Sequence, residues 1–207
     1  DELERLPEKL RKAYLDGNWD VFAGQYFTEW DREKHLCSPF LIPPTWKRFR
    51  AYDHGREKPA ACGWYALDYD GVVYKYREFY QAGLNIDQIA QEIKRLSVGE
   101  SYEYSVADPS LFANVGFVDK FGGQTIAESF ARQGVIFIPA SNRRVDGWNL
   151  FHQYLYWDNK KEPKIKFFNT CYNALRTIPI LIHDKIHPED LDTKGEDHSA
   201  DEPRYLL

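Results

Sequence analysis

Three segments between residues 46 and 83 are rich in aromatic and β-branched side chains, and they constrain the fold of this 207-residue chain more than any other feature. They read WKRFRAYD, ACGWYALDYDG and VVYKYREFYQAG, and Asp70-Gly71 lies between the last two. An Asp-Gly pair between two such segments is a strong signal for a β-hairpin. The sequence therefore predicts three antiparallel strands.

Helices and strands are expected to alternate after these three segments. NIDQIAQEIKRL places apolar residues at helical spacing behind Asn85, which is suited to cap the helix. ESYEYSVAD is expected to be a strand that stops at Pro109, because proline rarely continues a strand ladder. The remaining segments predict a helix, a strand, a helix, a strand and a helix interrupted at Pro179, followed by a final helix; in order they are TIAESFARQG, VIFIPAS, RRVDGWNLFHQYLYW, KIKFFNT and CYNALRTIPIL.

This order predicts an α/β fold with a mixed central sheet, three antiparallel strands and then parallel strands, flanked by helices. It is the arrangement of ribonuclease H-like domains, although a fold alone assigns no activity. Residues 46–207 would form this domain. Residues 1–45 are expected to be an arm or linker, with a short helix over 1–17 and then irregular structure, because three prolines in HLCSPFLIPPTW disfavour a regular element.

The composition argues against several classes of protein. No segment approaches the roughly 20 apolar residues that span a bilayer, and no apolar leader opens the chain, so we expect a cytoplasmic protein with no membrane contact. Cys37, Cys62 and Cys171 are scattered and odd in number, which fits neither a disulfide framework nor a zinc module, and we expect reduced thiols. No G-x-x-x-x-G-K-[ST] phosphate loop occurs, so no ATPase motif is present in this chain.

The charge is unevenly distributed along the chain. The formal net charge is -5, but residues 183–202 hold eight carboxylates against Lys185 and Lys194, which leaves +1 for everything else. A near-neutral body with local basic groups can bind DNA phosphate at one face. The basic residues considered for such a face are Arg48, Arg50, Arg56, Lys58, Lys120, Arg143, Arg144, Lys164, Lys166 and Arg176.

Two acidic residues stand at the ends of expected strands. Asp53 follows FRAY and Asp108 follows SVA, although each could simply begin a turn. An unpaired carboxylate in such surroundings is costly to desolvate, so Asp53 needs a partner. If the two strands are central neighbours, both carboxylates meet at one edge of the sheet, where they require a positive charge between them.

A third acid lies in the closing segment GEDHSADEPRYLL. His198 and Asp201 are three residues apart and share a helix face, and Asp197 is suited to cap that helix. Three converging acids suit two Mg²⁺ or Mn²⁺ ions, which prefer oxygen ligands and can activate water for phosphodiester hydrolysis. The alternative is a solvated C-terminal helix. Glu78, in the third strand segment, is expected to be solvated.

These segments together resemble the C-terminal nuclease domain of the large terminase subunit of tailed bacteriophages. The resemblance is carried, in order, by GNWDVFAGQYFTEW, FLIPPTWKRFRAYDHG, SVADPS, RRVDGW, FFNTCYNALRTIP and HPEDLDTKGEDHSADEPRY. It implies a metal-dependent endonuclease that cuts concatemeric double-stranded viral DNA in the host cytoplasm, transiently at the procapsid. It also implies an N-terminal ATPase domain before residue 1, connected through residues 1–45, with portal protein and small terminase subunit as partners.

The resemblance further implies roles for individual residues. Asp53, Asp108 and Asp201 match the family's acidic metal ligands, and His198 matches a position that lines the site in some relatives. Basic side chains around the site would contact phosphate, which positions DNA without reading its sequence. Those expected to do so are Arg56, Lys58, Lys120, Arg143 and Arg144.

One departure from the family concerns the last helix. The family continues after the third acid with Ala-Leu-Arg-Tyr, whereas this chain has Glu202-Pro203-Arg204-Tyr205. Proline within a helix removes an amide and tends to kink the helix, so a short or displaced helix is expected, with Asp197 as the reserve ligand. Two other interpretations stay open: a Holliday-junction resolvase or integrase-like nuclease on the same fold, and a non-catalytic docking module for portal protein or small terminase subunit.

Overall fold

The computed structural model describes residues 24–55, 58–114 and 125–207, and its centre is a seven-stranded sheet with the strand order β1-β7-β4-β3-β2-β5-β6. The strands are β1 (Leu36–Cys37), β2 (Lys47–Asp53), β3 (Ala60–Leu67), β4 (Val73–Gln81), β5 (Tyr104–Ala107), β6 (Ile138–Pro139) and β7 (Ile165–Phe168). The helices are α2 (Arg32–His35), α3 (Ile86–Leu96), α4 (Ile126–Arg132), α5 (Arg144–Leu155), α6 (Tyr172–Thr177) and α7 (His198–Leu206), with short 3₁₀ helices at Pro109–Phe112 and Ile178–Ile180.

The sheet is mixed, as predicted from the order of segments. Strands β2, β3 and β4 form the antiparallel meander, in which Lys47 pairs with Leu67 and Asp53 pairs with Ala61. On one side β5 runs parallel to β2 and β6 parallel to β5, and on the other side β7 runs parallel to β4 and β1 parallel to β7. Gly71 has a φ of 80° in the turn between β3 and β4, a conformation that glycine adopts without strain.

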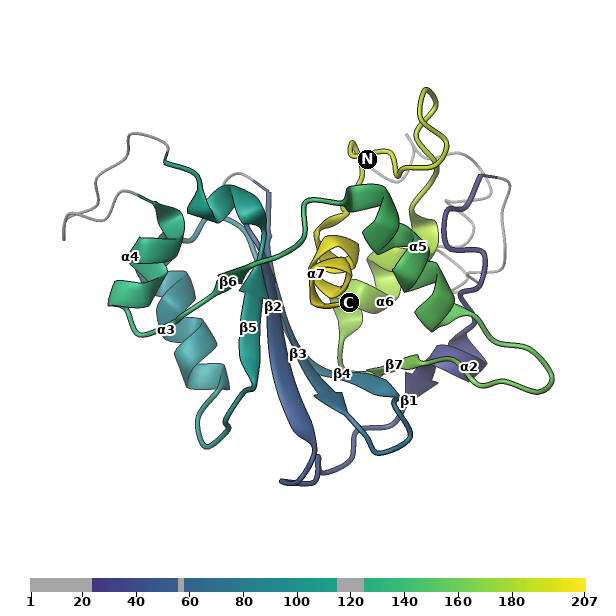
Figure 1. Ribbon diagram of the computed structural model, residues 1–207, viewed down its shortest axis with the longest axis horizontal. Coiled ribbons are helices and arrows are strands. Elements are labelled where there is room, and N and C mark those ends of the chain that lie inside the picture. Colours follow the sequence, from purple (N-terminus) through teal and green to yellow (C-terminus); the bar gives the residue numbers. More distant parts are fainter. Residues whose placement is uncertain (1–23, 56–57, 115–124) are drawn as a thin grey trace.

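Helices cover both faces of the sheet (Figure 1). Helices α3 and α4 lie on one face, where Tyr52 of β2 packs against Phe130 of α4 with ring centroids 5.2 Å apart. Helices α5, α6 and α7 lie on the other face, and Trp148 of α5 is fully buried there beside Phe27. Helix α7 packs directly over β2 and β3. The last helix therefore lies against the strand that ends at Asp53.

Local capping signals explain where two of these helices begin. The Asn85 side chain accepts a hydrogen bond from the Gln88 amide at the start of α3, and the Gln88 side chain accepts one in return from the Asn85 amide. Thr125 and Glu128 form the same reciprocal capping box at the start of α4. Each box satisfies amides that would otherwise lack partners at a helix N-terminus. The predicted cap of α3 at Asn85 is confirmed.

The expectation of irregular structure up to residue 45 misses two short elements in its described part. Leu36 and Cys37 form β1, which pairs with β7 and extends the sheet. Asp31 caps the short helix α2 just before it, since its carboxylate accepts hydrogen bonds from the Glu33 and Lys34 amides. The three prolines all follow β1, so they leave this short pairing intact. The helix expected over 1–17, together with Arg56 and Lys120, lies outside the described residues.

The expected disruption of the last helix by Pro203 does not occur. Helix α7 continues to Leu206, and the Leu207 amide donates to the Pro203 carbonyl at 3.2 Å. Pro203 lies inside the helix and is itself buried, between Asp201 and Glu202 on one side and Arg204 on the other, which are buried too. Asp201 therefore occupies the sheet-facing helix on which the sequence placed it.

Candidate active site

Asp53 and Asp108 end neighbouring parallel strands at the same edge of the sheet. Tyr52 of β2 pairs with Ala107 of β5, and the Asp108 amide donates to the Tyr52 carbonyl at 3.1 Å. Parallel strands in register bring the residues that follow them side by side. The expectation that both acids share one edge of the sheet is confirmed.

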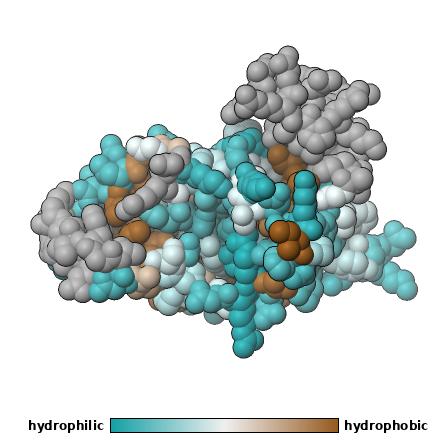
Figure 2. Space-filling view, turned by 90° about the horizontal axis from the view of Figure 1, so that it is seen from above, coloured by the Kyte–Doolittle hydropathy of each residue, from teal (hydrophilic) through white to brown (hydrophobic). Residues whose placement is uncertain are grey.

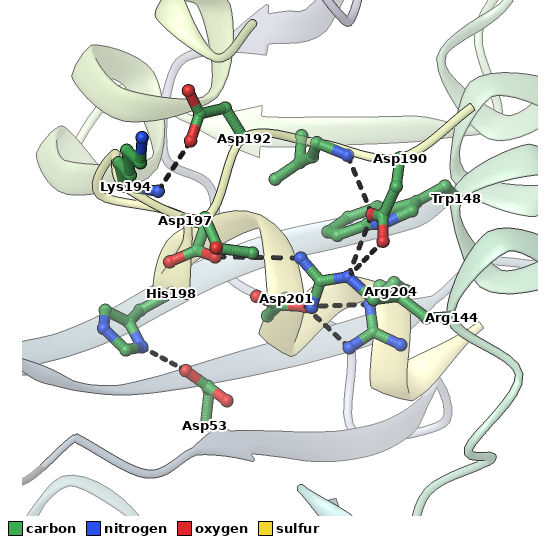
Figure 3. A network of polar contacts seen from close by, with 12 residues as sticks. Asp53, Arg144, Trp148, Asp190, Asp192, Lys194, Asp197, His198, Asp201 and Arg204 are labelled. Carbon is green, nitrogen blue, oxygen red and sulfur yellow. Dashed lines mark hydrogen bonds and ion pairs between the residues drawn. The ribbon is translucent and has the colours of Figure 1, made fainter. Parts of the chain in front are cut away.

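Helix α7 supplies partners to both oxygens of Asp53. His198 contacts Oδ2 through Nδ1, and the Tyr205 hydroxyl donates to Oδ1 at 3.1 Å. Figure 3 shows the His198 ring pointing from α7 toward Asp53. Burial lowers the pKa of His198, but the hydrogen bond to the Asp53 carboxylate and its charge outweigh burial and raise it. The partner that buried Asp53 requires is thus provided by residues far along the chain.

Asp201 is held by two arginines. Its Oδ1 accepts from Arg204 Nε at 2.9 Å and Nη2 at 2.6 Å, and from Arg144 Nη1 at 3.2 Å. Burial raises the pKa of Asp201 to about 7; Arg204 opposes this shift, and the nearby Asp53 charge adds to it. Burial of the carboxylate therefore outweighs the attraction of both guanidinium groups.

Arg144 joins the site to the segment that precedes α7 (Figure 3). Its Nε donates to Asp190 at 2.9 Å, and its Nη2 lies 3.7 Å from Asp197. Trp148 donates to the same Asp190 oxygen at 2.8 Å. This guanidinium is engaged by several carboxylates, so it holds the chain around Asp201. A contact of Arg144 with DNA phosphate stays a prediction.

Asp197 does not cap α7 with its side chain, and that prediction is wrong. It occupies the cap position with helical backbone angles, but its carboxylate makes no cap hydrogen bond. The carboxylate lies toward Arg144 instead, at 3.7 Å from Nη2. Burial raises its pKa against the opposing charge of His198. Asp197 is therefore a second buried acid beside Asp201, in keeping with its place as the reserve ligand.

Asp108 also serves the turn that the sequence suggested. Its Oδ1 accepts from the Ser110 amide at 2.8 Å and caps the 3₁₀ helix that begins at Pro109. Tyr205 lies within reach of the charges of all three acids. Burial raises the pKa of Tyr205, and the charges of Asp53, Asp201 and Asp108 raise it further. The Tyr205 hydroxyl therefore lies in negatively charged surroundings, in contact with Asp53.

The donors suit a hard divalent cation in kind, but they are not gathered around one point. Within the described ranges no group of three or more His, Cys, Asp or Glu side chains is arranged to hold a metal ion. Asp53 and Asp108 follow paired residues of neighbouring strands, and His198 Nε2 is buried without a hydrogen-bond partner among the described residues. Asp201 directs Oδ1 to the arginines. Ions could therefore be held by Asp53, Asp108 and His198, with Asp201 joining once its arginine contacts loosen.

Two of the basic residues predicted to contact DNA lie at the described surface. Lys58 Nζ donates to the Thr193 carbonyl at 3.1 Å. Its positive charge acts to lower the pKa of both Asp197 and His198. The Arg143 side chain is 82% exposed and lies 3.6 Å from Asp146. The surface seen from above the view of Figure 1 is largely hydrophilic where it is described (Figure 2). A polar polymer such as DNA is compatible with that surface.

The structure adds one buried charged group that the sequence did not reveal. Glu78 was expected to be solvated, but its side chain is only 8% exposed. It accepts hydrogen bonds from the Asn173 amide at 2.6 Å and the Ala174 amide at 3.1 Å. It therefore caps the start of α6. Its neighbour Lys75 is also buried and contacts Glu202 of α7. A lysine in a strand does not indicate its partner, so no sequence signal could have found this pair.

Solved structures of phage large terminases resemble this fold. The large terminase of a thermophilic bacteriophage, in complex with ADP, has a TM-score of 0.72 and 21% identity over 99% of this chain and 50% of that chain. The nuclease domain of the P22 large terminase has a TM-score of 0.67 and 20% identity, over 88% of this chain and 90% of that chain. The fold is that of a large terminase nuclease domain.

A third similar structure contains a metal. The large terminase nuclease from thermophilic phage G20c, with bound cobalt, has a TM-score of 0.60 and 13% identity over 89% of this chain and 97% of that chain. The chain spans about half the length of the ADP-bound large terminase. No protein-family model matches the sequence, and no curated protein matches it either. Among the described helices, none is both long and apolar enough to cross a membrane.

Proposed function

We propose that this chain is the metal-dependent endonuclease domain of a viral DNA-packaging terminase, which hydrolyses phosphodiester bonds of concatemeric double-stranded DNA. The observation that carries the proposal is the meeting of Asp53 and Asp108 at one sheet edge, beneath a helix that brings His198 and Asp201. Acids clustered at such an edge suit the binding of divalent cations. The resemblance to terminase nuclease domains supports the same activity.

The proposed metal requirement is supported by the acidic and histidine side chains near the sheet edge and by the cobalt bound in the G20c nuclease. Asp53, Asp108 and Asp201, with His198 and the reserve ligand Asp197, would hold two Mg²⁺ or Mn²⁺ ions. Such ions activate water on one side of a scissile phosphate and stabilise the leaving oxygen on the other. The same charge would oppose the burial and the nearby Asp53 charge that together raise the pKa of Asp201.

The chain's own residues orient these ligands and the substrate. Tyr205 and His198 fix the rotamer of Asp53 by contacting one oxygen each. Arg144 and Arg204 hold Asp201 in place through its Oδ1. Basic side chains would position the DNA backbone beside the acids without reading its sequence. Those proposed for this role are Lys58 and Arg143, with Arg56, Lys120 and Arg144.

The proposal extends to the rest of the protein through the longer relative. The large terminase that contains ADP is about twice as long as the part this chain matches. We expect an N-terminal ATPase domain before residues 1–45, with residues 46–207 as the nuclease domain. Portal protein and small terminase subunit would be partners, and the site of action would be the host cytoplasm at the procapsid.

Plasmid cleavage tests the proposal. The chain is incubated with supercoiled plasmid and Mn²⁺, and the loss of supercoiled DNA is followed over time. Asp53→Asn should slow cleavage by at least about a hundredfold, because it removes a ligand charge at the reacting centre. Asp70→Asn, the same substitution at an exposed turn, is the matched control and should cut like the parent.

The outcome also separates the alternatives. Cleavage by Asp53→Asn at the parental rate would place the activity elsewhere and refute the assignment. Much faster cutting of a four-way junction than of linear duplex would indicate a resolvase-like nuclease. No cleavage by the parent with Mn²⁺ would favour a docking module.

A further inference from the structure

A buried ion pair links α7 to the middle of the sheet, behind the candidate site. Lys75 of β4 contacts Glu202 Oε1, and each side chain is 1% exposed. The Tyr65 hydroxyl of β3 donates to the other oxygen of Glu202 at 2.6 Å. Lys75 Nζ also lies 3.8 Å from Glu78. Both oxygens of Glu202 are therefore held from two different strands.

Gly63 of β3 provides the space for this contact. A Cβ atom at this position would overlap both carboxylate oxygens of Glu202. The φ of Gly63 is not positive, so the backbone itself does not require glycine. The absence of a side chain is therefore needed for the close approach of Glu202 to β3.

Stability alone is a weak reason for such a pair. Two charges removed from water carry a large desolvation cost, and well-packed apolar residues of similar volume often stabilise a fold as well or better. An ion pair with fixed hydrogen-bond directions also restricts how the helix can rotate and shift on the sheet. A purely apolar contact between α7 and the sheet would tolerate small rotations and shifts of the helix more readily.

Glu202 lies on the same helix as two residues of the candidate site. Glu202 follows Asp201 directly, and His198 lies four residues earlier on the same helix. Because α7 is one short rigid element, fixing Glu202 over Gly63 also fixes the height and rotation at which His198 meets Asp53. The contact of His198 with Asp53 and the placement of Asp201 then depend on the buried pair.

We propose that Lys75 and Glu202 are positioning residues, which set α7 on the sheet so that His198 reaches Asp53 and Asp201 faces the metal-binding edge. The role of the pair in placing α7 follows from the contacts alone. The consequence of that placement for metal binding rests on the proposed function. The pair acts on the site through α7, and neither member touches DNA or an ion.

The decisive variant is the double substitution Lys75→Met with Glu202→Leu. It removes both charges of the pair together, and Glu78, which loses Lys75 as a neighbour, keeps its hydrogen bonds from the Asn173 and Ala174 amides. We expect the variant to fold and to bind Mn²⁺ about tenfold more weakly by calorimetry, which is the effect of losing support behind a metal ligand. The kcat for plasmid cleavage should fall by a similar factor, with little change in KM for DNA.

A second readout does not depend on metal or activity. A long-range ¹H–¹⁵N spectrum of the histidine side chains reports whether His198 Nδ1 keeps its hydrogen bond to Asp53. The signature should be present in the parent and weakened or lost in the double variant. The control removes an exposed pair on α3, Glu92→Leu with Arg95→Met, and should leave both the signature and the Mn²⁺ affinity unchanged.

Glu202→Asp keeps the proposal testable if the double variant does not fold. It retains the charge but shortens the side chain by one methylene, so Lys75 can be reached only if α7 moves. The His198 signature should again weaken, and the Mn²⁺ affinity should fall by about threefold, less than in the double variant.

The results separate this inference from the proposed function. An unchanged His198 signature and an Mn²⁺ affinity within about twofold of the parent, in the folded variants, would overturn the positioning role. A parent that binds Mn²⁺ but cuts no DNA would refute the nuclease, while the signature and the affinity would still decide the role of Lys75 and Glu202.

Discussion

His198 and Asp53 are in contact although 145 residues separate them in the sequence. The contact joins the last helix to the end of β2, next to the end of β5. Because Tyr205 on the same helix holds the other oxygen of Asp53, α7 determines which direction this carboxylate faces. The geometry of the candidate site therefore depends on how α7 sits on the sheet.

Substitution of Tyr205 tests this dependence. Tyr205→Phe removes the hydroxyl that donates to Asp53 Oδ1 and leaves the ring in place. Stability should fall by about 1 kcal/mol, the usual net value of one such hydrogen bond. Plasmid cleavage should slow by about tenfold, because Asp53 gains freedom to rotate.

The measurements for Tyr205 are thermal unfolding and initial cleavage rates. Tyr104→Phe, at a partly exposed tyrosine of β5, is the control and should leave the cleavage rate unchanged. A parental cleavage rate in Tyr205→Phe would show that His198 alone is sufficient to orient Asp53.

Arg143 and Arg144 are adjacent in the sequence, but their substitution should have different effects. Arg143 is 82% exposed, so Arg143→Ala should weaken DNA binding and lower the slope of log affinity against log salt by about 1. Arg144 is engaged by Asp190 and Asp201, so Arg144→Ala should lower stability by about 1–2 kcal/mol, discounted for its partial exposure.

Binding of a short duplex at several salt concentrations, together with chemical unfolding, distinguishes these effects. Equal salt slopes for the parent and Arg143→Ala would remove Arg143 from the DNA-binding surface. An unchanged unfolding free energy in Arg144→Ala would show that the contacts of Arg144 add nothing to stability.

Much of the fold could be predicted because its signals are local. Asp70-Gly71 identified the hairpin between β3 and β4, and Asn85 identified the start of α3. β1 was missed because it has two residues, Leu36 and Cys37, and is stabilised only by pairing with β7. Such a short strand has no pattern of its own, and only tertiary contacts define it.

The site could be predicted only as far as strand order allows. Asp53 and Asp108 were placed together because both end strands that could be neighbours. Of the two arginines that hold Asp201, Arg144 was not predicted, since it comes from another helix and pairing between distant charges leaves no periodic pattern. Lys75 was missed for the same reason, because its contact with Glu202 crosses 127 residues of sequence.

The acid stability of the fold should depend on Glu100. Burial raises the pKa of Glu100, but hydrogen bonds from Arg77, Tyr102 and Tyr76 outweigh burial and lower it. A carboxylate with a lowered pKa in the folded state contributes stability at neutral pH. That contribution is lost as the pH falls below the ordinary glutamate pKa of about 4.3 and through the folded value.

Glu100→Gln should therefore reduce stability at pH 7 by about 2 kcal/mol, the usual value for hydrogen bonds to a charged group. The difference from the parent should narrow as the pH falls below about 4. Urea unfolding from about pH 3 to pH 7 measures both quantities. A difference that does not change with pH would mean that the charge of Glu100 contributes nothing.

Added Mn²⁺ should stabilise the folded chain if the acids at the sheet edge bind it. An ion near Asp53 and Asp108 binds the folded state alone, because the unfolded chain does not hold these residues together. At a free Mn²⁺ concentration of about 100 times the dissociation constant, the gain should be about 2.7 kcal/mol. Relief of the repulsion between Asp53 and Asp201 would contribute to this gain. Thermal unfolding with increasing Mn²⁺ measures it. Asp53→Asn should abolish the increase, whereas Asp70→Asn should retain it in full, and an equal increase in both variants would place the ion away from the sheet edge.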